Sequence, residues 1–385
     1  MKRRNKILIA KTLMLVALLV ITFVVTGCAA GTGQVAWSGA TIENGALFVG
    51  SLGRIAAIDT ANGNFLWDKT LETEGSSGGF GCAIPASKIP IYGSTAVAGE
   101  LVYVGGADGK VYAFTIDTGA SRWVYPRSGN LGAVILGGTV VNQDIVYVCT
   151  VAGDVYALDV VNGDYIWDYD IGEDVWATPA VADNTLYIGT FDKNVYAIDI
   201  NTGEEKWQHP FETGGPIISS VVIDGDVLYI ASFDRHIYAL NKESGEPIWQ
   251  YPDVDGGEEN PEKWFWASPV LCNGSIYAAN MDGKVYVIDA GSGGLVTAID
   301  LGAAISSTPV AVGDEVFVAT EEGRVYSINT TSLNQEIMRD LELRIIAPLA
   351  VDDNIVYIHT QEKEAIYAMN SETGTIIWDT PMDIE

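Results

Sequence analysis

The chain has 385 residues, with 50 acidic and 21 basic side chains and a formal net charge of −29. A surface this acidic repels phosphate backbones and anionic lipid, which argues against nucleic-acid binding and against direct adsorption to a membrane. The four cysteines are widely spaced and form no CxxC pair, so they predict neither a disulfide framework nor a cysteine-ligated metal site.

Residues 1–27 have the pattern of a secretory signal. Basic residues between Lys2 and Lys6 precede a mostly apolar run from Leu13 to Val25, which is short for a membrane span. The run ends in Val-Thr-Gly-Cys28, which resembles the lipobox of bacterial lipoproteins. That resemblance implies cleavage before Cys28, lipidation of its thiol, and a lipidated tether at residues 28–36. The alternative is an uncleaved anchor helix with a chance cysteine.

From residue 37 onward, one sequence unit recurs eight times. The clearest copy runs from Val195 to Trp207, and its frame of alanine, aspartate, glycine and tryptophan returns at intervals of 40 to 56 residues. Such a period suits a four-stranded unit. The eight predicted units are residues 37–71, 92–127, 134–171, 176–211, 217–251, 266–300, 306–340 and 346–381.

Each unit divides into four short strands separated by turn residues. In the fourth unit we expect strands around Ala180 and at 186–190, 195–199 and 206–210. The inner strands are apolar on both faces, so each sheet must be covered on both sides. We therefore predict an all-β fold in which residues 37–385 form one eight-bladed β-propeller of four-stranded antiparallel blades. The first and last units look complete, which predicts ring closure by docking of blade 8 on blade 1 without a swapped strand.

A tryptophan near the end of six units has a structural explanation. A large ring in the last strand of a blade can be wedged against the neighbouring blade, where its burial stabilises the ring. The predicted docking residues are Trp67, Trp123, Trp167, Trp207, Trp249 and Trp378.

The Ala-x-Asp-x-x-x-Gly-x-x-x-Trp frame resembles the tryptophan-docking repeat of the quinoprotein (PQQ-like) propellers. A lipoprotein of this size with eight such repeats most resembles the BamB family of accessory lipoproteins of the outer-membrane β-barrel assembly machine. The resemblance implies a non-catalytic scaffold that needs no cofactor and holds an envelope protein partner, as a monomer or as a subunit of a larger complex. It also implies a lipid anchor outside the cytoplasm, on the periplasmic side of the outer membrane if the host has two membranes.

An oxidoreductase that uses PQQ and Ca²⁺ is the alternative within the same superfamily. Many quinoproteins carry adjacent cysteines beside the quinone, and this chain has none. Acids such as Asp59, Asp159 and Asp199 belong to the repeated turn, and the three histidines occupy unlike positions in three units. No catalytic residue can therefore be selected from the sequence.

Two insertions depart from the repeat, at residues 76–85 and 253–263. Both connect the last strand of one blade to the first strand of the next, so both are expected on one face, around the channel mouth. Long loops on a rigid scaffold often carry binding function. The candidate binding residues are the aromatic side chains expected there, which are Trp37, Phe80, Trp176, Trp264, Phe265 and Trp266.

Two alternatives stand beside protein docking for this face. The tryptophans that head the first strands could simply fill space between blades, or they could bind glycans. Asp253, Asp255 and Glu258 could offer oxygen ligands to Ca²⁺, although the segment lacks an EF-hand frame and also fits an exposed acidic loop.

Overall fold

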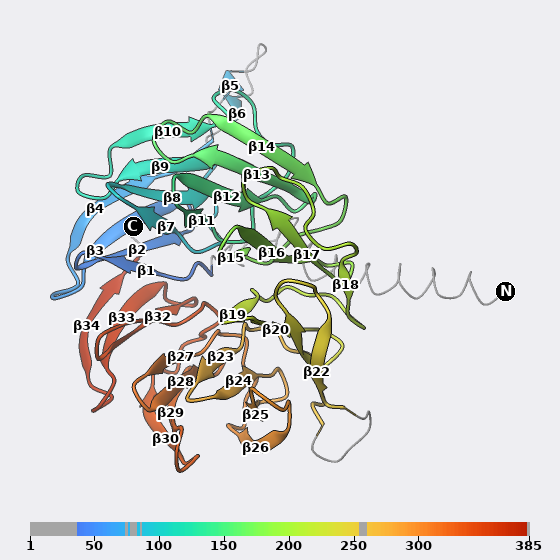
Figure 1. The fold of residues 1–385 in the computed structure, drawn as a ribbon. Helices are drawn as coiled ribbons and strands as arrows, with labels where there is room; N and C mark the ends of the chain where they lie inside the picture. Colours follow the sequence, from blue (N-terminus) through green and yellow to red (C-terminus); the bar gives the residue numbers. More distant parts are fainter. Residues whose placement is uncertain (1–36, 74–75, 78–82, 85–86, 254–259, 383–385) are drawn as a thin grey trace.

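The structure is a computed structural model that describes residues 37–73, 76–77, 83–84, 87–253 and 260–382 (Figure 1). The predicted signal peptide, the tether and Cys28 lie outside these residues. The described chain forms eight four-stranded antiparallel sheets arranged as a ring, together with one two-stranded hairpin. The prediction of an all-β, eight-bladed propeller is confirmed. Within the described residues, no helix is long and apolar enough to cross a membrane.

The strands of each blade follow one another in sequence order, from strand A beside the channel to strand D at the rim. Blades 1 to 4 are β1–β4 (Thr41–Glu43, Ala46–Ser51, Arg54–Asp59, Phe65–Thr70), β7–β10 (Ala96–Ala98, Leu101–Gly105, Val111–Thr115, Ser121–Tyr125), β11–β14 (Val140–Asn142, Ile145–Cys149, Asp154–Asp159, Tyr165–Asp170) and β15–β18 (Ala180–Ala182, Thr185–Gly189, Asn194–Asp199, Phe211–Glu212). Blades 5 to 8 are β19–β22 (Val222–Asp224, Val227–Ala231, Ile237–Asn241, Pro247–Tyr251), β23–β26 (Val270–Cys272, Ser275–Ala279, Lys284–Asp289, Leu295–Asp300), β27–β30 (Val310–Val312, Glu315–Ala319, Arg324–Asn329, Gln335–Asp340) and β31–β34 (Ala350–Asp352, Ile355–Thr360, Ala365–Asn370, Ile376–Pro381). The hairpin is β5 (Ser76–Ser77) and β6 (Ala83–Ile84).

The middle strands form the core because both of their faces are covered. Every residue of β2 is buried, whereas β14 buries its tryptophan and exposes the residues on either side. Each apolar cluster joins two adjacent blades; one contains Tyr147 and Trp167 of blade 3 together with Leu186 and Ile198 of blade 4. Burial of apolar area therefore holds blades to each other as much as it holds strands within a blade.

Cys149 and Cys272 are buried, as the apolar runs around them predicted. Burial raises the pKa of the Cys149 thiol to about 12. Because only the thiolate is nucleophilic, this cysteine acts as a small apolar residue. Cys82 lies outside the described residues.

The outermost strand of blade 4 differs from the prediction. Residues 206–210 do not form a strand; Glu205 makes a single bridge to Ile198, and β18 begins only at Phe211. Pro210 lacks an N–H group and cannot donate to a ladder, which explains why regular pairing is interrupted just before β18. Trp207 still reaches the next blade, because its Nε1 donates to the Lys242 carbonyl oxygen at 3.1 Å.

The six repeat tryptophans lie between adjacent blades. Each indole N–H donates to a carbonyl oxygen in the C–D turn of the next blade, and each ring covers a glycine of that turn with positive φ. A Cβ atom on Gly163, for example, would lie 2.5 Å from the ring of Trp123. The six bonds run from Trp67 to Ile116 (2.6 Å), Trp123 to Val160 (3.0 Å), Trp167 to Ile200 (2.8 Å), Trp207 to Lys242 (3.1 Å), Trp249 to Ala290 (3.0 Å) and Trp378 to Thr60 (2.9 Å).

The last of these bonds closes the ring. Trp378 of blade 8 docks on blade 1, and Thr380 donates its hydroxyl to the Gly63 carbonyl oxygen at 2.5 Å. The Arg54 guanidinium of blade 1 donates to the Met382 carbonyl oxygen at 2.8 Å, beyond the end of β34. Because blades 1 and 8 are each built from consecutive strands, closure rests on docking and not on a swapped strand.

Replacing Trp167 by alanine is expected to lower the free energy of unfolding by about 3 to 5 kcal/mol, because a cavity forms and the Ile200 carbonyl loses its donor. The neighbouring Ile166 is 42% exposed, so Ile166→Ala is the matched control, with an expected change within about 0.5 kcal/mol. Denaturant unfolding of both variants measures the difference. Equal effects would contradict the structural role of the tryptophan.

Candidate functional site

The residues four positions before each A strand form a ring at the channel mouth, which we call the mouth ring. They lie where the D–A connections enter the blades, on the same face as the B–C turns. Seven of the eight are large apolar residues and one is serine. The mouth ring consists of Trp37, Tyr92, Leu136, Trp176, Ile218, Trp266, Ser306 and Ile346.

The residues one position earlier point the other way. Ile91, Ile135, Val175 and Ile217 are fully buried under the blades, and Phe265 is their equivalent in blade 6. Its ring is fully buried and packs edge-on against Tyr286 at 5.9 Å between centroids. Phe265 is therefore a core residue and not an exposed binding residue, which corrects the prediction made for it. The alternation of an extended chain explains why Trp264 and Trp266, on either side, face outward.

Trp264 and Trp266 form an exposed aromatic cluster with Phe233. The two indoles are 44% and 39% exposed, and their centroids lie 5.9 and 5.7 Å from the ring of Phe233. Phe233 belongs to the B–C turn of blade 5, so the cluster spans two blades. The main chain holds it in place: Met281 N–H, from the B–C turn of blade 6, donates to the Trp264 carbonyl oxygen at 3.2 Å.

The other predicted mouth tryptophans are only partly exposed. Trp37 lies 4.4 Å from the ring of Tyr92, its neighbour in the mouth ring, and Trp176 lies 5.1 Å from Phe191. The Trp176 indole N–H is buried and has no hydrogen-bond partner within the described residues. These two residues therefore pack against other rings and are only partly exposed.

Both insertions lie in D–A connections, as predicted, but the β5–β6 hairpin of the first lies at the outer edge of the ring and not around the channel mouth (Figure 1). Bridges from Glu72 to Lys88 and from Leu52 to Pro90 hold the base of the first insertion, and the β5–β6 hairpin projects from the ring (Figure 1). Phe80 lies outside the described residues. Asp255 and Glu258 of the second insertion also lie outside them, so the Ca²⁺ hypothesis for this loop stays a prediction.

The acidic side chains of the repeat are structural. Asp199 at the end of β17 accepts hydrogen bonds from the main-chain N–H groups of Asn201 and Thr202, at 2.9 and 3.1 Å, which lower the pKa of its carboxyl. Asp234 of a B–C turn accepts the Tyr238 hydroxyl at 2.6 Å. Within the described residues, no group of three or more histidines, cysteines or acids could hold a metal ion. The PQQ and Ca²⁺ alternative likewise stays a prediction.

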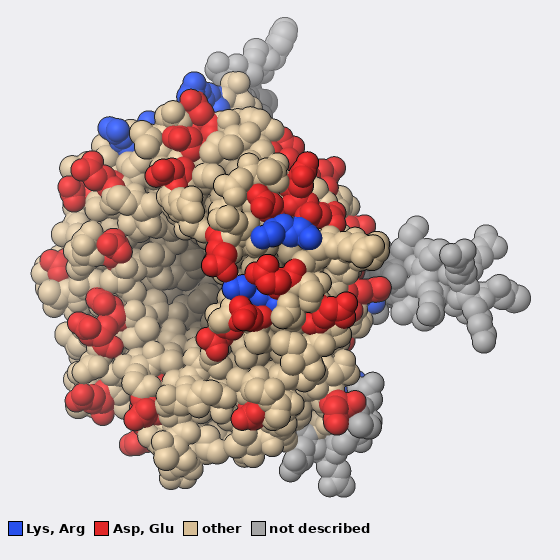
Figure 2. Space-filling view, in the orientation of Figure 1, with Lys and Arg blue, Asp and Glu red and all other residues tan. Residues whose placement is uncertain are grey.

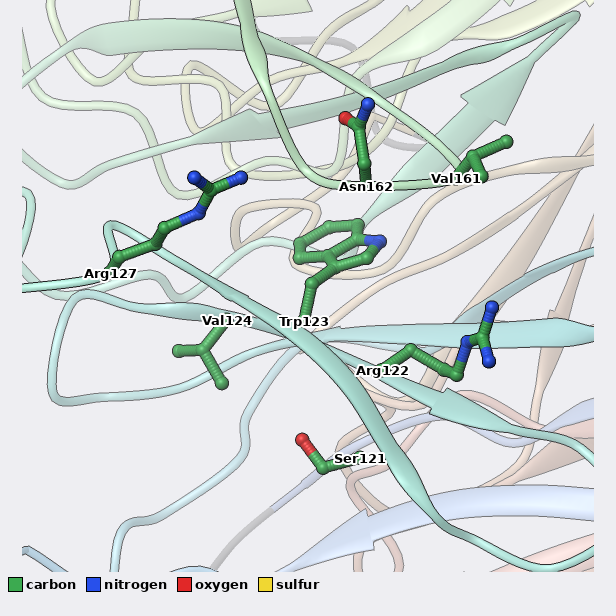
Figure 3. A pocket seen from close by; sticks show the side chains of 7 residues that line it. All are labelled: Ser121, Arg122, Trp123, Val124, Arg127, Val161 and Asn162. Atoms are coloured by element: carbon green, nitrogen blue, oxygen red, sulfur yellow. The ribbon is translucent and has the colours of Figure 1, made fainter.

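The face in Figure 2 carries many acidic side chains around a hollow at the centre of the ring, with few basic ones among them. The aromatic cluster is an exposed apolar patch on an otherwise acidic surface. Protein contact surfaces typically have such a composition, with aromatic residues enriched and charged residues depleted at their centre. Figure 3 shows a different kind of pocket, of about 500 Å³, at the junction of blades 2 and 3. There the Trp123 indole occupies its docking position beneath Val161 and Asn162, so this pocket lies over a filled junction.

These features define an eight-bladed propeller of tryptophan-docking repeats with an apolar mouth and aromatic residues exposed beside it. The family model of the outer membrane protein assembly factor BamB matches residues 23–251 and 281–382. The chain therefore belongs to the BamB family.

A curated relative, the outer membrane protein assembly factor BamB of Moranella endobia (strain PCIT), is 29% identical over 128 residues. That match covers 30% of this chain and 32% of the relative, so it spans about a third of the relative's length. Among solved structures, BamB from Moraxella catarrhalis superimposes with a TM-score of 0.66 at 20% identity, covering 85% of this chain and 90% of that one. The computationally designed Ika8 protein gives 0.71 at 17% identity, covering 88% and 97%. At these identities the structural likeness shows the fold alone.

Single alanine substitutions should separate the surface from the core in this segment. Phe265→Ala is expected to lower the free energy of unfolding by about 3 to 5 kcal/mol, because it empties a buried site. Trp264→Ala removes a ring that is 44% exposed, so its expected cost is about 1 kcal/mol or less. Thermal or denaturant unfolding measures both. A larger loss for Trp264→Ala than for Phe265→Ala would show that the assignment is reversed.

Proposed function

We propose that this protein is a non-catalytic interaction scaffold in the assembly of outer-membrane proteins, and that it holds a protein partner at its mouth ring and aromatic cluster. Membership of the BamB family supports the process. The observation that supports this binding site is the cluster of Phe233, Trp264 and Trp266. It spans two blades and is exposed on an acidic protein.

Three physical features make this cluster suitable for docking. Tryptophan is the residue most enriched among those that dominate binding energy, because one side chain buries a large apolar area. The cluster is held by a rigid ring of sheets, so little order has to be gained on binding. The net charge of −29 favours a partner with basic residues and speeds the encounter with it.

The lipid anchor belongs to the same proposal. Lipidation of Cys28 would keep the propeller near the membrane through residues 28–36, since the acidic surface gives no attraction to anionic lipid. The propeller would then meet its partner on the extracytoplasmic side, and on the periplasmic side of the outer membrane in a host with two membranes.

Replacing Cys28 by alanine is expected to release the protein from the membrane fraction without unfolding the ring. Mass spectrometry of the wild-type N-terminus should show a mature chain that begins at a diacylated Cys28, and fractionation should find the variant in the soluble fraction. An unmodified cysteine in an uncleaved N-terminal segment would contradict the anchor.

The docking surface is tested by affinity purification from solubilised membranes. The double variant Trp264→Ala/Trp266→Ala is expected to recover its main protein partner at least about tenfold less than wild type, as for loss of a binding hot spot. Ile248 and Val296 are each 50% exposed on outer strands, so Ile248→Ala/Val296→Ala removes comparable surface elsewhere. Equal recovery by all three proteins would refute this docking surface.

A further inference from the structure

Three tyrosines and one aspartate gather on the outer strands at the junction of blades 2 and 3. Tyr125 is the last residue of β10, Tyr156 lies in β13, and Tyr165 and Asp168 lie in β14. The ring centroids of Tyr125 and Tyr156 are 6.3 Å apart. The Tyr165 hydroxyl donates to the Asp168 carboxylate at 2.6 Å. We call these four residues the tyrosine site.

The strand register turns all four side chains toward the same junction. Asp168 lies directly opposite Tyr156 in the β13–β14 pair, and Tyr165 lies opposite Leu158. Leu158, Tyr156 and Tyr125 all pack in the apolar cluster that blades 2 and 3 share. Because directly opposite residues lie on one face of a sheet, Asp168 and Tyr165 face blade 2 as well.

Blade 3 lacks the usual partner of its strand C tyrosine. In blades 2, 5 and 6 the hydroxyl of the equivalent tyrosine donates to an aspartate of the B–C turn. These bonds run from Tyr112 to Asp108 (2.6 Å), Tyr238 to Asp234 (2.6 Å) and Tyr286 to Asp282 (2.8 Å). Blade 3 has Ala152 at that turn position, and the Tyr156 hydroxyl makes no hydrogen bond within the described residues. Its oxygen is therefore available to a donor from outside the chain.

The tyrosine site carries a negative charge that no basic side chain of the described residues neutralises. Asp168 is exposed and makes no ion pair there, and Arg127 of the same junction pairs instead with Asp164 at 2.6 Å. Burial, followed by the charges of Asp154 and Asp168, raises the pKa of Tyr156 to about 12. Its phenol therefore stays protonated at neutral pH, and the charge of the site is that of its carboxylates.

Aromatic rings beside a carboxylate are suited to an organic cation. The negative face of each ring attracts a cation placed over it, and the attraction grows when the cation loses water. The carboxylate adds a charge-assisted acceptor for N–H groups. A metal ion is less suited, because no group of three or more histidines, cysteines or acids among the described residues could hold one.

We propose that the tyrosine site binds a basic side chain, lysine or arginine, of a partner protein. Asp168 and the Tyr156 hydroxyl oxygen would accept its N–H groups, and the rings would cover its alkyl stem. A second copy is disfavoured as the source, because two chains with a net charge of −29 repel each other. The site lies on outer strands, away from the mouth ring, so this inference does not rest on the proposed function.

The test is an NMR titration of the intact protein with the peptide acetyl-Gly-Lys-Gly-amide and with its norleucine analogue, which keeps the stem and lacks the charge. Binding over the rings is expected to shift the ε-methylene proton signals of the lysine upfield. The norleucine peptide should bind at least about fivefold more weakly, because it makes neither the cation–π contact nor the ion pair. Equal binding of the two peptides would overturn the proposal. So would tighter binding of tetramethylammonium, which has no N–H group and would assign the site to a quaternary ammonium.

Two substitutions that remove the same charge locate the binding. Asp379 occupies the equivalent place in β34, opposite Tyr367, but blades 7 and 8 supply no further tyrosines there. Those places are taken by Ile376 and Arg339. Asp168→Asn is expected to weaken binding of the lysine peptide by at least about fivefold, whereas Asp379→Asn should leave it unchanged. Equal losses in the two variants would reduce the effect to net charge and overturn the site.

A third variant separates the rings from the charge. Tyr165 is 52% exposed, so Tyr165→Leu removes a ring without emptying the core, and it should reduce both the upfield shift and the affinity for the lysine peptide. Unchanged binding in both Asp168→Asn and Tyr165→Leu would overturn the proposal. Self-association in sedimentation experiments that Asp168→Asn abolishes and Asp379→Asn preserves would assign the site to a second copy and would also overturn it.

Discussion

The insertion of a tryptophan from one blade into the next is the interaction on which the ring depends. Each indole combines a large buried apolar area with one directed hydrogen bond, and each requires a glycine beneath it. Because the receiving glycine lies in the following blade, each of these six junctions fixes the rotation between two blades as well as their contact. Repeating that rotation closes the ring. The closing hydrogen bond from Trp378 to the Thr60 carbonyl oxygen is the same as the bonds between the other blades.

A ring held in this way leaves its D–A connections free to vary. Trp67 and Trp249, the docking residues that precede the two insertions, make the same contact as the other docking tryptophans. The main chain entering each A strand alternates, with one residue buried under the blade and the next at the mouth. This alternation turns a simple repeat into a ring of apolar side chains, and the insertion before blade 6 extends that ring with Trp264.

The repeat made most of the fold predictable, since eight spaced copies specify blade number and the frame singles out the docking tryptophans. The site was harder because it depends on which way single residues face. Trp264, Phe265 and Trp266 form one aromatic run in sequence, and only the start of β23 shows that the middle residue faces the core. Aligning Phe265 with Ile91 and Val175 would have revealed this. Pro210 gave a comparable signal against a regular outer strand in blade 4.

The two junctions without tryptophan show how the same loss can be resolved in different ways. Between blades 6 and 7, Leu333 adopts a strained, positive φ and packs into the junction. Between blades 7 and 8, the bulge of β30 lies nearer the end of the strand than in the docking blades, so its main chain meets Gly374 and Ile337 faces solvent. In the first case a side chain of the next blade packs into the junction, and in the second Met338 packs there and Phe317 stays buried. Both junctions therefore stay packed without a docking tryptophan.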